Sequence, residues 1–201
     1  MKIVIIKYNA GNIRSVAFAL ERIGITPIIT DDAEEIRSAD KVIFPGVGEA
    51  SSAMKYLSER KLDEVIKSLT QPVLGICLGV QLMCNFSEEG NTKCLGIFNQ
   101  DVKKFSQTGA DKGVLKIPQI GWNTIFDLKS SLFKNIKENS YMYFVHSYFV
   151  ELGENTIATT NYGINYSSAL QKNNFYAVQF HTEKSSDVGQ KILENFIEKC
   201  Q

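Results

Sequence analysis

The stretch PVLGICLGVQLM, residues 72–83, decides how this chain folds. Residues 73–76 are an apolar run of strand length, and a helical pattern follows over residues 80–85. Between them, Gly75–Gly79 (GICLG) is a G-x-C-x-G motif, the thiol form of the sharp strand-to-helix turn that exposes a nucleophile. Glycines leave room for a crowded backbone, while the helix N-terminus stabilises a thiolate and offers N–H groups to an oxyanion. The pattern predicts a strand, a nucleophilic Cys77 and a helix in direct succession.

Cys77 also has a plainer interpretation, because a free cysteine beside two packing glycines is often part of a hydrophobic core. Cys84, Cys94 and Cys200 have no glycine flanks, and we interpret them as core residues. The four cysteines form no CxxC pair and no dense framework, so reduced thiols are expected.

The first half of the chain alternates apolar runs with amphipathic stretches, the pattern of parallel strands joined by helical crossovers. Strands are predicted over residues 2–6, 26–29 and 41–44, and helices over residues 13–23 and 54–69. This pattern is typical of an α/β fold whose strands form a doubly wound sheet.

The second half changes character after about residue 90 and favours strands over residues 141–150, 164–170 and 175–180. A final helix is predicted over residues 186–199, because its apolar positions form one stripe. We therefore expect a flavodoxin-like, mostly parallel sheet with helices on both faces and an antiparallel extension in the second half.

Composition excludes several classes of function. Lys plus Arg and Asp plus Glu balance at 22 each, so no net charge attracts nucleic acid or an anionic membrane. The two histidines and the scattered cysteines predict no metal, and the absence of GxGxxG and GxxxxGK[ST] patterns predicts no nucleotide cofactor. The apolar run at residues 3–6 is too short for a secretory signal, and no stretch has membrane-spanning length. A cytoplasmic protein that acts on small molecules or proteins is expected.

Two histidines are available as the base that a cysteine nucleophile needs. His181 ends an apolar strand and Glu183 stands two residues later, so the period of a strand directs both side chains to one face. An acid there fixes the imidazole tautomer and stabilises the imidazolium. An isolated H-x-E also occurs as a strand-end histidine beside a solvated acid. His146 lies in an aromatic segment, and we interpret it as a structural or pocket-lining residue.

Residues 45–48 (PGVG) end another predicted strand, and Gly46 and Gly48 free the backbone to present its N–H groups. The carboxyl ends of the strands line one crevice in a doubly wound sheet, so this turn and Cys77 are expected to face the same site. The turn is a candidate wall of an oxyanion hole, although an ordinary tight turn has the same residues.

Together these residues resemble class I glutamine amidotransferases, and among them the glutaminase subunits of imidazole glycerol phosphate synthases. GICLG with a late H-x-E is specific for the superfamily, and the other segments point to these subunits. The resemblance covers nearly the whole chain, at residues 8–16 (YNAGNIRSV), 45–48 (PGVG), 72–81 (PVLGICLGVQ), 87–90 (SEEG), 118–123 (PQIGWN), 144–148 (FVHSY) and 179–185 (QFHTEKS). The chain departs from the family pattern at Thr182, where the HPEKS form has proline, and at Lys7, Asn9 and Gln119.

The resemblance implies one glutamine amidotransferase domain over residues 1–201 that hydrolyses glutamine to glutamate and ammonia. Cys77 would form a γ-glutamyl thioester, His181 would act as base and acid, and Glu183 would orient His181. Backbone groups of Val47 and Leu78 would form the oxyanion hole. The substrate would be held by residues of the same segments, namely Gly46, Gly48, Gly79, Gln81, His146, Ser147 and Tyr148.

The resemblance also implies a protein partner, a (β/α)8-barrel cyclase subunit that forms a heterodimer with this chain and receives the ammonia. There a phosphoribulosyl-formimino intermediate of histidine biosynthesis is split into imidazole glycerol phosphate and the purine precursor AICAR. Asn12, Trp122, Tyr143 and Lys184 match positions at or near this interface. Three of them also have plainer interpretations: Asn12 as the N-cap of the first helix, Trp122 as a core anchor and Lys184 as a surface charge.

Two alternatives stay open on the sequence. A paralogous glutaminase would supply ammonia to another acceptor, such as a synthase of surface sugars. A non-catalytic scaffold would keep the fold and bind a partner, but it has no reason to retain Cys77, His181 and Glu183 together.

Overall fold

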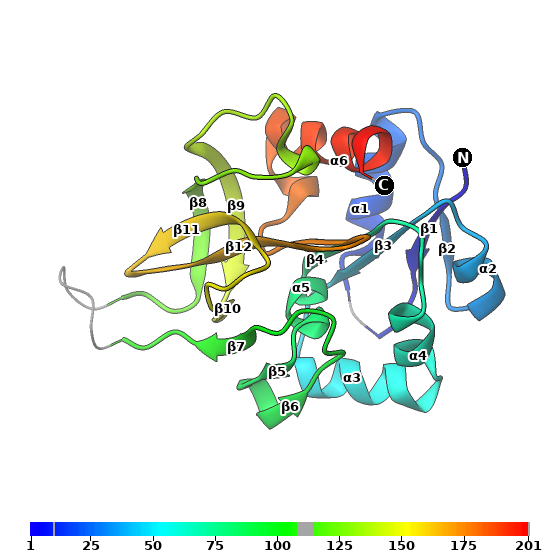
Figure 1. Cartoon of the computed structure of the whole chain (residues 1–201), viewed down its shortest axis with the longest axis horizontal. Helices are drawn as coiled ribbons and strands as arrows, with labels where there is room; N and C mark the ends of the chain where they lie inside the picture. Colours follow the sequence, from blue (N-terminus) through cyan, green and yellow to red (C-terminus); the bar gives the residue numbers. More distant parts are fainter. Residues whose placement is uncertain (10, 108–114, 201) are drawn as a thin grey trace.

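The structure, a computed structural model, describes residues 1–9, 11–107 and 115–200. Its described part is built on an 11-stranded sheet with the strand order β2-β1-β3-β4-β13-β12-β10-β7-β5-β6, in which β11 pairs with β12. Figure 1 shows helices on both sides of this sheet, and a second, two-stranded sheet of β8 and β9 beyond β11 and β12.

One half of the large sheet is parallel and consists of β1 (Ile3–Ile6), β2 (Ile28–Thr30), β3 (Lys41–Gly46), β4 (Val73–Cys77) and β13 (Phe175–Val178). β4 lies between β3 and β13. The helices are α1 (Ile13–Arg22), α2 (Ala33–Arg37), α3 (Ala50–Glu59), α4 (Leu62–Lys67), α5 (Leu78–Met83) and α6 (Ser186–Lys199).

The other half of the sheet begins where β12 (Ile164–Lys172) pairs antiparallel with β13. It continues through β10 (Tyr148–Val150), β7 (Asp101–Lys104), β5 (Phe86–Ser87), β6 (Thr92–Lys93) and β11 (Thr156–Tyr162). The second sheet pairs β8 (Gln119–Ile125) with β9 (Ser140–His146), and three short 3-10 helices complete the described elements: η1 (Glu89–Asn91), η2 (Ser131–Phe133) and η3 (Thr182–Lys184).

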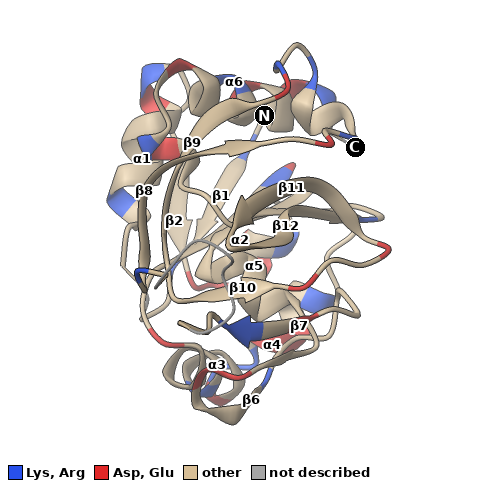
Figure 2. Ribbon diagram, turned by 90° about the vertical axis from the view of Figure 1, so that its left-hand side faces the viewer, with Lys and Arg blue, Asp and Glu red and all other residues tan. Residues whose placement is uncertain are grey.

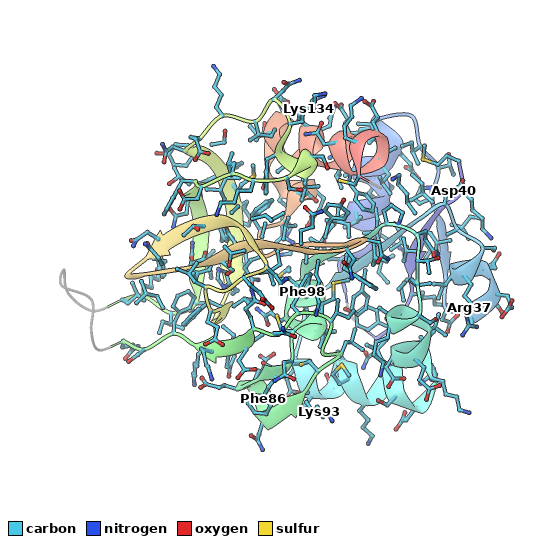
Figure 3. All side chains as sticks on the ribbon, in the orientation of Figure 1. Arg37, Asp40, Phe86, Lys93, Phe98 and Lys134 are labelled. Atoms are coloured by element: carbon cyan, nitrogen blue, oxygen red, sulfur yellow. The ribbon has the colours of Figure 1, made fainter. Side chains whose placement is uncertain are left out.

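Alternate residues of the central strands enter two different cores. Ile3 and Ile5 of β1 pack with residues of α1 and α6, whereas Val4 and Ile6 pack with residues of α3, α4 and α5. Both faces of the parallel strands are therefore buried, which is why these strands are continuous apolar runs in the sequence. Figure 3 shows side chains filling the space between sheet and helices, with the buried Phe98 inside.

The structure confirms the α/β class, with a parallel first half and an antiparallel extension. The last helix has the predicted bounds, and the strand that precedes Cys77 is β4. Helix α2 and strands β5, β6, β7, β8 and β11 had no counterpart in the prediction. No helix in the described ranges is long and apolar enough to cross a membrane.

The prediction of one helix over residues 54–69 is wrong. The segment forms two helices, α3 and α4, because Lys61 adopts a left-handed conformation with φ 58° that interrupts the helix. After the break, Leu62, Val65 and Ile66 are buried in the same core as Leu57. A break at a lysine has no sequence signal, since glycine and asparagine are the usual residues in this conformation.

Candidate active site

Cys77 lies at the junction of β4 and α5, with φ 55° and ψ −106°. Such a conformation is strained for a residue with a side chain and persists only where the surroundings fix it. The two neighbouring glycines allow the surroundings to pack closely enough to fix it. A Cβ on Gly79 would lie 2.0 Å from the carbonyl oxygen of Phe44 in β3, and a Cβ on Gly75 would lie 3.0 Å from Sδ of Met83. The two glycines allow α5 to start directly against β3, with Cys77 at its N-terminus.

His181 and Glu183 form a buried pair beyond the end of β13. The imidazole Nδ1 lies 2.6 Å from Oε1 of Glu183, and Nδ1 must carry the proton because a carboxylate only accepts. The predicted reason for this contact was wrong, because β13 ends at Val178 and no strand continues through the pair. The 3-10 turn of η3 returns the carboxylate to the imidazole instead, with Thr182 at the position of the family's proline.

His181 and Glu183 each stabilise the charged form of the other. Burial lowers the pKa of His181, but hydrogen bonds with the side chains of Cys77 and Glu183, and the charges of both, raise it to about 10. Burial raises the pKa of Glu183, but hydrogen bonds from His181 and Asn12 and the imidazolium charge hold it below its ordinary value. The arrangement favours the imidazolium form of His181, which a thiol nucleophile with a histidine partner requires.

Asn12 is the third member of this buried network. Its Nδ2 donates a hydrogen bond of 2.5 Å to Oε1 of Glu183 and lies 3.3 Å from Nδ1 of His181. Asn12 is the N-cap residue of α1, as predicted, but its side chain makes no capping hydrogen bond. An N-capping side chain needs an extended backbone, whereas Asn12 has φ 74°.

A cavity of about 310 Å³ opens at the Cys77 turn. Its size is that of a pocket for a small ligand. Its lining comes from β4, α5, η1, β9, β10 and η3, from the segments that follow β3, β9 and β13, and from the residue before β8. The lining residues are Val47, Gly48, Cys77, Leu78, Gln81, Glu89, Pro118, Val145, His146, Ser147, Tyr148, His181 and Lys184. Segments far apart in the sequence thus bring a thiol, an imidazole and the PGVG turn to one cavity. The described residues contain no cluster of His, Cys, Asp or Glu suited to a metal ion.

Comparison with known proteins identifies the family to which the chain belongs. The family described as "Glutamine amidotransferase class-I" matches residues 4–200. The chain belongs to the class-I glutamine amidotransferase family.

Two relatives of this amidotransferase are similar over nearly their whole length, and both have the name "Imidazole glycerol phosphate synthase subunit HisH". The one from Bacteroides fragilis (strain YCH46) is 57% identical, over 98% of this chain and 100% of that protein. The one from Haemophilus influenzae (strain Rd) is 49% identical, over 99% of this chain and 98% of that protein.

Solved structures share the fold at low sequence identity. The structure of PurLQS from Thermotoga maritima has a TM-score of 0.69 and 15% identity, and the match covers 98% of this chain and 97% of that one. A second structure, of a glutamine amidotransferase, has a TM-score of 0.70 and 16% identity, with 98% and 99% covered.

Two predicted site residues of this amidotransferase, Gly46 and Gly79, are absent from the cavity lining and pack behind it. Gly46 is packed under Tyr8, because a Cβ on it would lie 2.0 Å from the Tyr8 hydroxyl. Gly79 packs against β3, as described above. Gln81 lines the cavity, but its Nε2 is already bonded to the carbonyl oxygen of Tyr148 at 3.1 Å and to Oε1 of Gln179 at 3.0 Å. Gln179, which the sequence did not single out, places its own Nε2 3.8 Å from the sulfur of Cys77.

His146 lines the cavity with both of its nitrogens occupied. Nδ1 lies 2.6 Å from the carbonyl oxygen of Tyr148, and Nε2 lies 3.2 Å from the hydroxyl of Tyr166. Burial lowers the pKa of His146, and although the Tyr148 carbonyl opposes this, the pKa falls to about 4. Its ring is therefore neutral at pH 7. The hydroxyl of Tyr166 also lies 3.0 Å from Oε1 of Gln119, so Gln119 extends the network.

Glu89 is a cavity residue for which the sequence gave no role, although it lies in the quoted SEEG segment. Its Oε2 accepts from the backbone N–H of Ala50 at 2.8 Å, which ties η1 to the start of α3. Burial raises the pKa of Glu89, the Ala50 N–H lowers it, and the charge of Glu49 raises it further. The signal for its role appears only when η1 is folded over the cavity.

Three of the predicted interface residues, Trp122, Tyr143 and Lys184, lie on or beside the second sheet. The interpretation of Trp122 as a core anchor is wrong, because it is 53% exposed on β8. Its ring meets that of Tyr143 on β9 edge to face, with centroids 5.8 Å apart. The amine of Lys184 lies 5.9 Å from the centre of the Tyr143 ring, on the cavity side of this pair.

Proposed function

We propose that this chain is the glutaminase subunit of an imidazole glycerol phosphate synthase and that residues 1–201 form one amidotransferase domain. Its relatives of that name match it over nearly their full length. The observation that carries the chemistry is the hydrogen-bonded His181 and Glu183 pair, 2.6 Å apart, whose imidazole lines the same cavity as Cys77.

The proposed reaction proceeds in two steps. The sulfur of Cys77 attacks the side-chain carboxamide carbon of glutamine, and His181 passes the thiol proton to the departing ammonia. The C–N bond breaks and a γ-glutamyl thioester forms. A water molecule then attacks the thioester, His181 takes its proton, and glutamate leaves with return of the proton to the thiol. The carboxylate of Glu183 keeps Nδ1 protonated, so that Nε2 is the nitrogen that exchanges protons.

The oxyanion of each step is assigned to the backbone N–H groups of Val47 and Leu78. Both residues line the cavity beside Cys77, and Leu78 is the first residue of α5, where the helix dipole favours negative charge. Gly46 and Gly79 serve this site through packing, because each leaves space that a side chain would fill.

Glutamine recognition is assigned to the charged and polar groups of the wall. Among the described residues that line the cavity, Glu89 has the one carboxylate. We assign it to the α-ammonium group of glutamine, while Ser147, Tyr148 and Gly48 surround the rest of the substrate. Replacing Glu89 with Gln is expected to raise KM for glutamine more than it lowers kcat, as steady-state glutamate release will show. A change confined to kcat would contradict the assignment.

The partner is proposed to be a (β/α)8-barrel cyclase subunit that binds over the second sheet. Ile120 and Trp122 on β8 and Tyr141 on β9 are 59%, 53% and 62% exposed. Neither strand contains a charged residue, and Figure 2 shows both ribbons without Lys, Arg, Asp or Glu. An exposed aromatic and aliphatic surface free of charge is typical of the centre of an interface. Ammonia released at Cys77 would pass to the cyclase in this heterodimer.

We further propose a cytoplasmic location. The four cysteines are buried and free, and free thiols persist in a reducing compartment.

Glutamate release from glutamine tests the proposal directly. The Cys77→Ala variant is expected to have no activity while its circular dichroism spectrum is unchanged, because only the sulfur is lost. The wild type is measured alone and with the ligand-loaded cyclase of the same genome, and stimulation by that cyclase is expected. Activity retained in Cys77→Ala would rule out the thioester mechanism.

The alternative, a paralogous glutaminase for surface-sugar synthesis, is separated by growth. Deletion of the gene is expected to abolish growth without histidine, and the Cys77→Ala gene is expected not to restore it. Unimpaired growth of the deletion strain would favour the paralogue.

A further inference from the structure

We propose that Asn12 is a positioning residue of the catalytic pair: its amide holds the Glu183 carboxylate in the orientation that fixes His181. The inference rests on the proposed function, in which His181 serves Cys77. The sequence predicted Asn12 as a contact with the partner subunit, whereas this inference gives it a role inside the catalytic site.

Two contacts join the start of α1 to η3. Nδ2 of Asn12 lies 2.5 Å from Oε1 of Glu183 and 3.3 Å from Nδ1 of His181, although these residues are 171 and 169 positions away along the chain. Nδ2 and the protonated Nδ1 are both donors, so they do not bond each other. They lie close because both donate to the same carboxylate oxygen.

The shared oxygen explains what the amide contributes. With His181 as its one side-chain donor, the carboxylate would be held less firmly about its terminal torsion, which has a broad energy minimum. A second donor from another element limits that rotation and keeps the oxygen opposite Nδ1. Groups that hold a ligating or catalytic histidine in this way fix its tautomer and ring orientation.

The backbone of Asn12 shows that the contact has a cost. Its φ of 74° lies in the left-handed region, and its side chain gives up the capping bond that an N-cap asparagine normally makes. Helix α1 therefore begins without a side-chain cap at Asn12, while the amide serves Glu183. A residue whose role is to start the helix has no reason for this arrangement.

The Asn12→Gly variant separates the two roles. Glycine adopts a φ of 74° without strain, so the substitution removes the amide and leaves the turn. We expect kcat for glutamine hydrolysis to fall by about tenfold with KM unchanged, the usual size of effect for a group that orients a catalytic residue. The acid limb of the kcat–pH profile should move up by about one pH unit. The reason is that the charged form of Glu183 loses a hydrogen-bond donor, which raises the pKa of its carboxyl group. The melting temperature at neutral pH should fall by no more than about 2–4 °C, because the lost hydrogen bond also stabilises the charged Glu183 of the folded chain.

A matched control is Asn139→Gly. Asn139 is also left-handed, with φ 62°, and is exposed, so its replacement is expected to leave kcat and the pH profile unchanged. Asn12→Asp keeps the shape but sets a carboxylate against Glu183, and it is expected to lower kcat further and move the acid limb further up. Wild-type kcat and pH profile in Asn12→Gly would overturn the proposal, as would a fall in melting temperature with no pH shift.

The titration of the Glu183 carboxyl group, followed by NMR, keeps this test independent of the proposed function. If the wild type releases no glutamate even with the cyclase, the proposed function fails. The titration midpoint of Glu183 should still be higher in Asn12→Gly than in the wild type, and equal midpoints would overturn the role of Asn12.

Discussion

The Gly79→Ala variant tests whether the close approach of α5 to β3 positions the nucleophile. The added Cβ would lie 2.0 Å from the carbonyl oxygen of Phe44, whereas ordinary contacts begin at 3.4 Å. Phe44 is fully buried and its strand is paired on both sides, with β1 and β4, so β3 cannot yield. The start of α5 must move by more than about 1 Å, carrying the N–H of Leu78 with it.

The cost follows from this displacement. Overpacking a core costs about 1–3 kcal/mol, and a clash with immobile backbone belongs at the upper end, about 3 kcal/mol. For a chain of this size each kcal/mol lowers the melting temperature by about 2–4 °C, so a fall of about 6–12 °C is expected. Misplacing a catalytic group by about 1 Å also lowers kcat by about a hundredfold.

Thermal unfolding followed by circular dichroism, together with glutamate release in the presence of the cyclase, measures both effects. The control is Gly24→Ala: its φ is 82° and no atom lies within 4 Å of the added Cβ, so it pays for backbone strain but not for a clash. We expect it to cost about 1 kcal/mol and to leave kcat unchanged. Wild-type melting temperature and kcat in Gly79→Ala would refute the packing argument.

Two further predictions concern stability. The hydroxyl of Tyr8 is buried with no hydrogen-bond partner among the described residues, so Tyr8→Phe is expected to stabilise the fold by about 1 kcal/mol and raise the melting temperature by about 2–4 °C; a decrease would show that the hydroxyl is paired in solution. His146 has a pKa of about 4 in the folded chain against an ordinary 6.5, so between these pH values the unfolded chain binds a proton that the folded chain does not. Stability therefore falls as the pH drops from 6.5 to 4, by about 3 kcal/mol, and calorimetry should find this part of the pH dependence missing in His146→Gln. The same slope in both proteins would contradict the prediction.

The candidate site could be predicted where its signal is local. The G-x-C-x-G motif fixes its own turn, because its two glycines and the adjoining strand and helix are consecutive in the chain. The stripe of apolar residues over 186–199 likewise fixed α6 to the residue. Such patterns depend on the periodicity of one element and need no knowledge of its neighbours.

Other features depended on which segments meet. The sequence placed Glu183 beside His181 through a strand, whereas a 3-10 turn makes the contact, and it assigned the amide of Asn12 to a helix cap. Glu89 and Gln179 had no signal of their own, since only the folded sheet brings η1 and β13 to Cys77.

The sequence by itself therefore predicted the α/β class from the alternation of strands and helices. It also singled out Cys77, His181 and Glu183 as catalytic candidates, because these signals lie within a few consecutive residues. The tertiary structure alone decided how these groups are held: the network through Asn12, the cavity wall and the exposed second sheet. These depend on contacts such as that of Asn12 with Glu183, 171 residues apart, for which local periodicity contains no information.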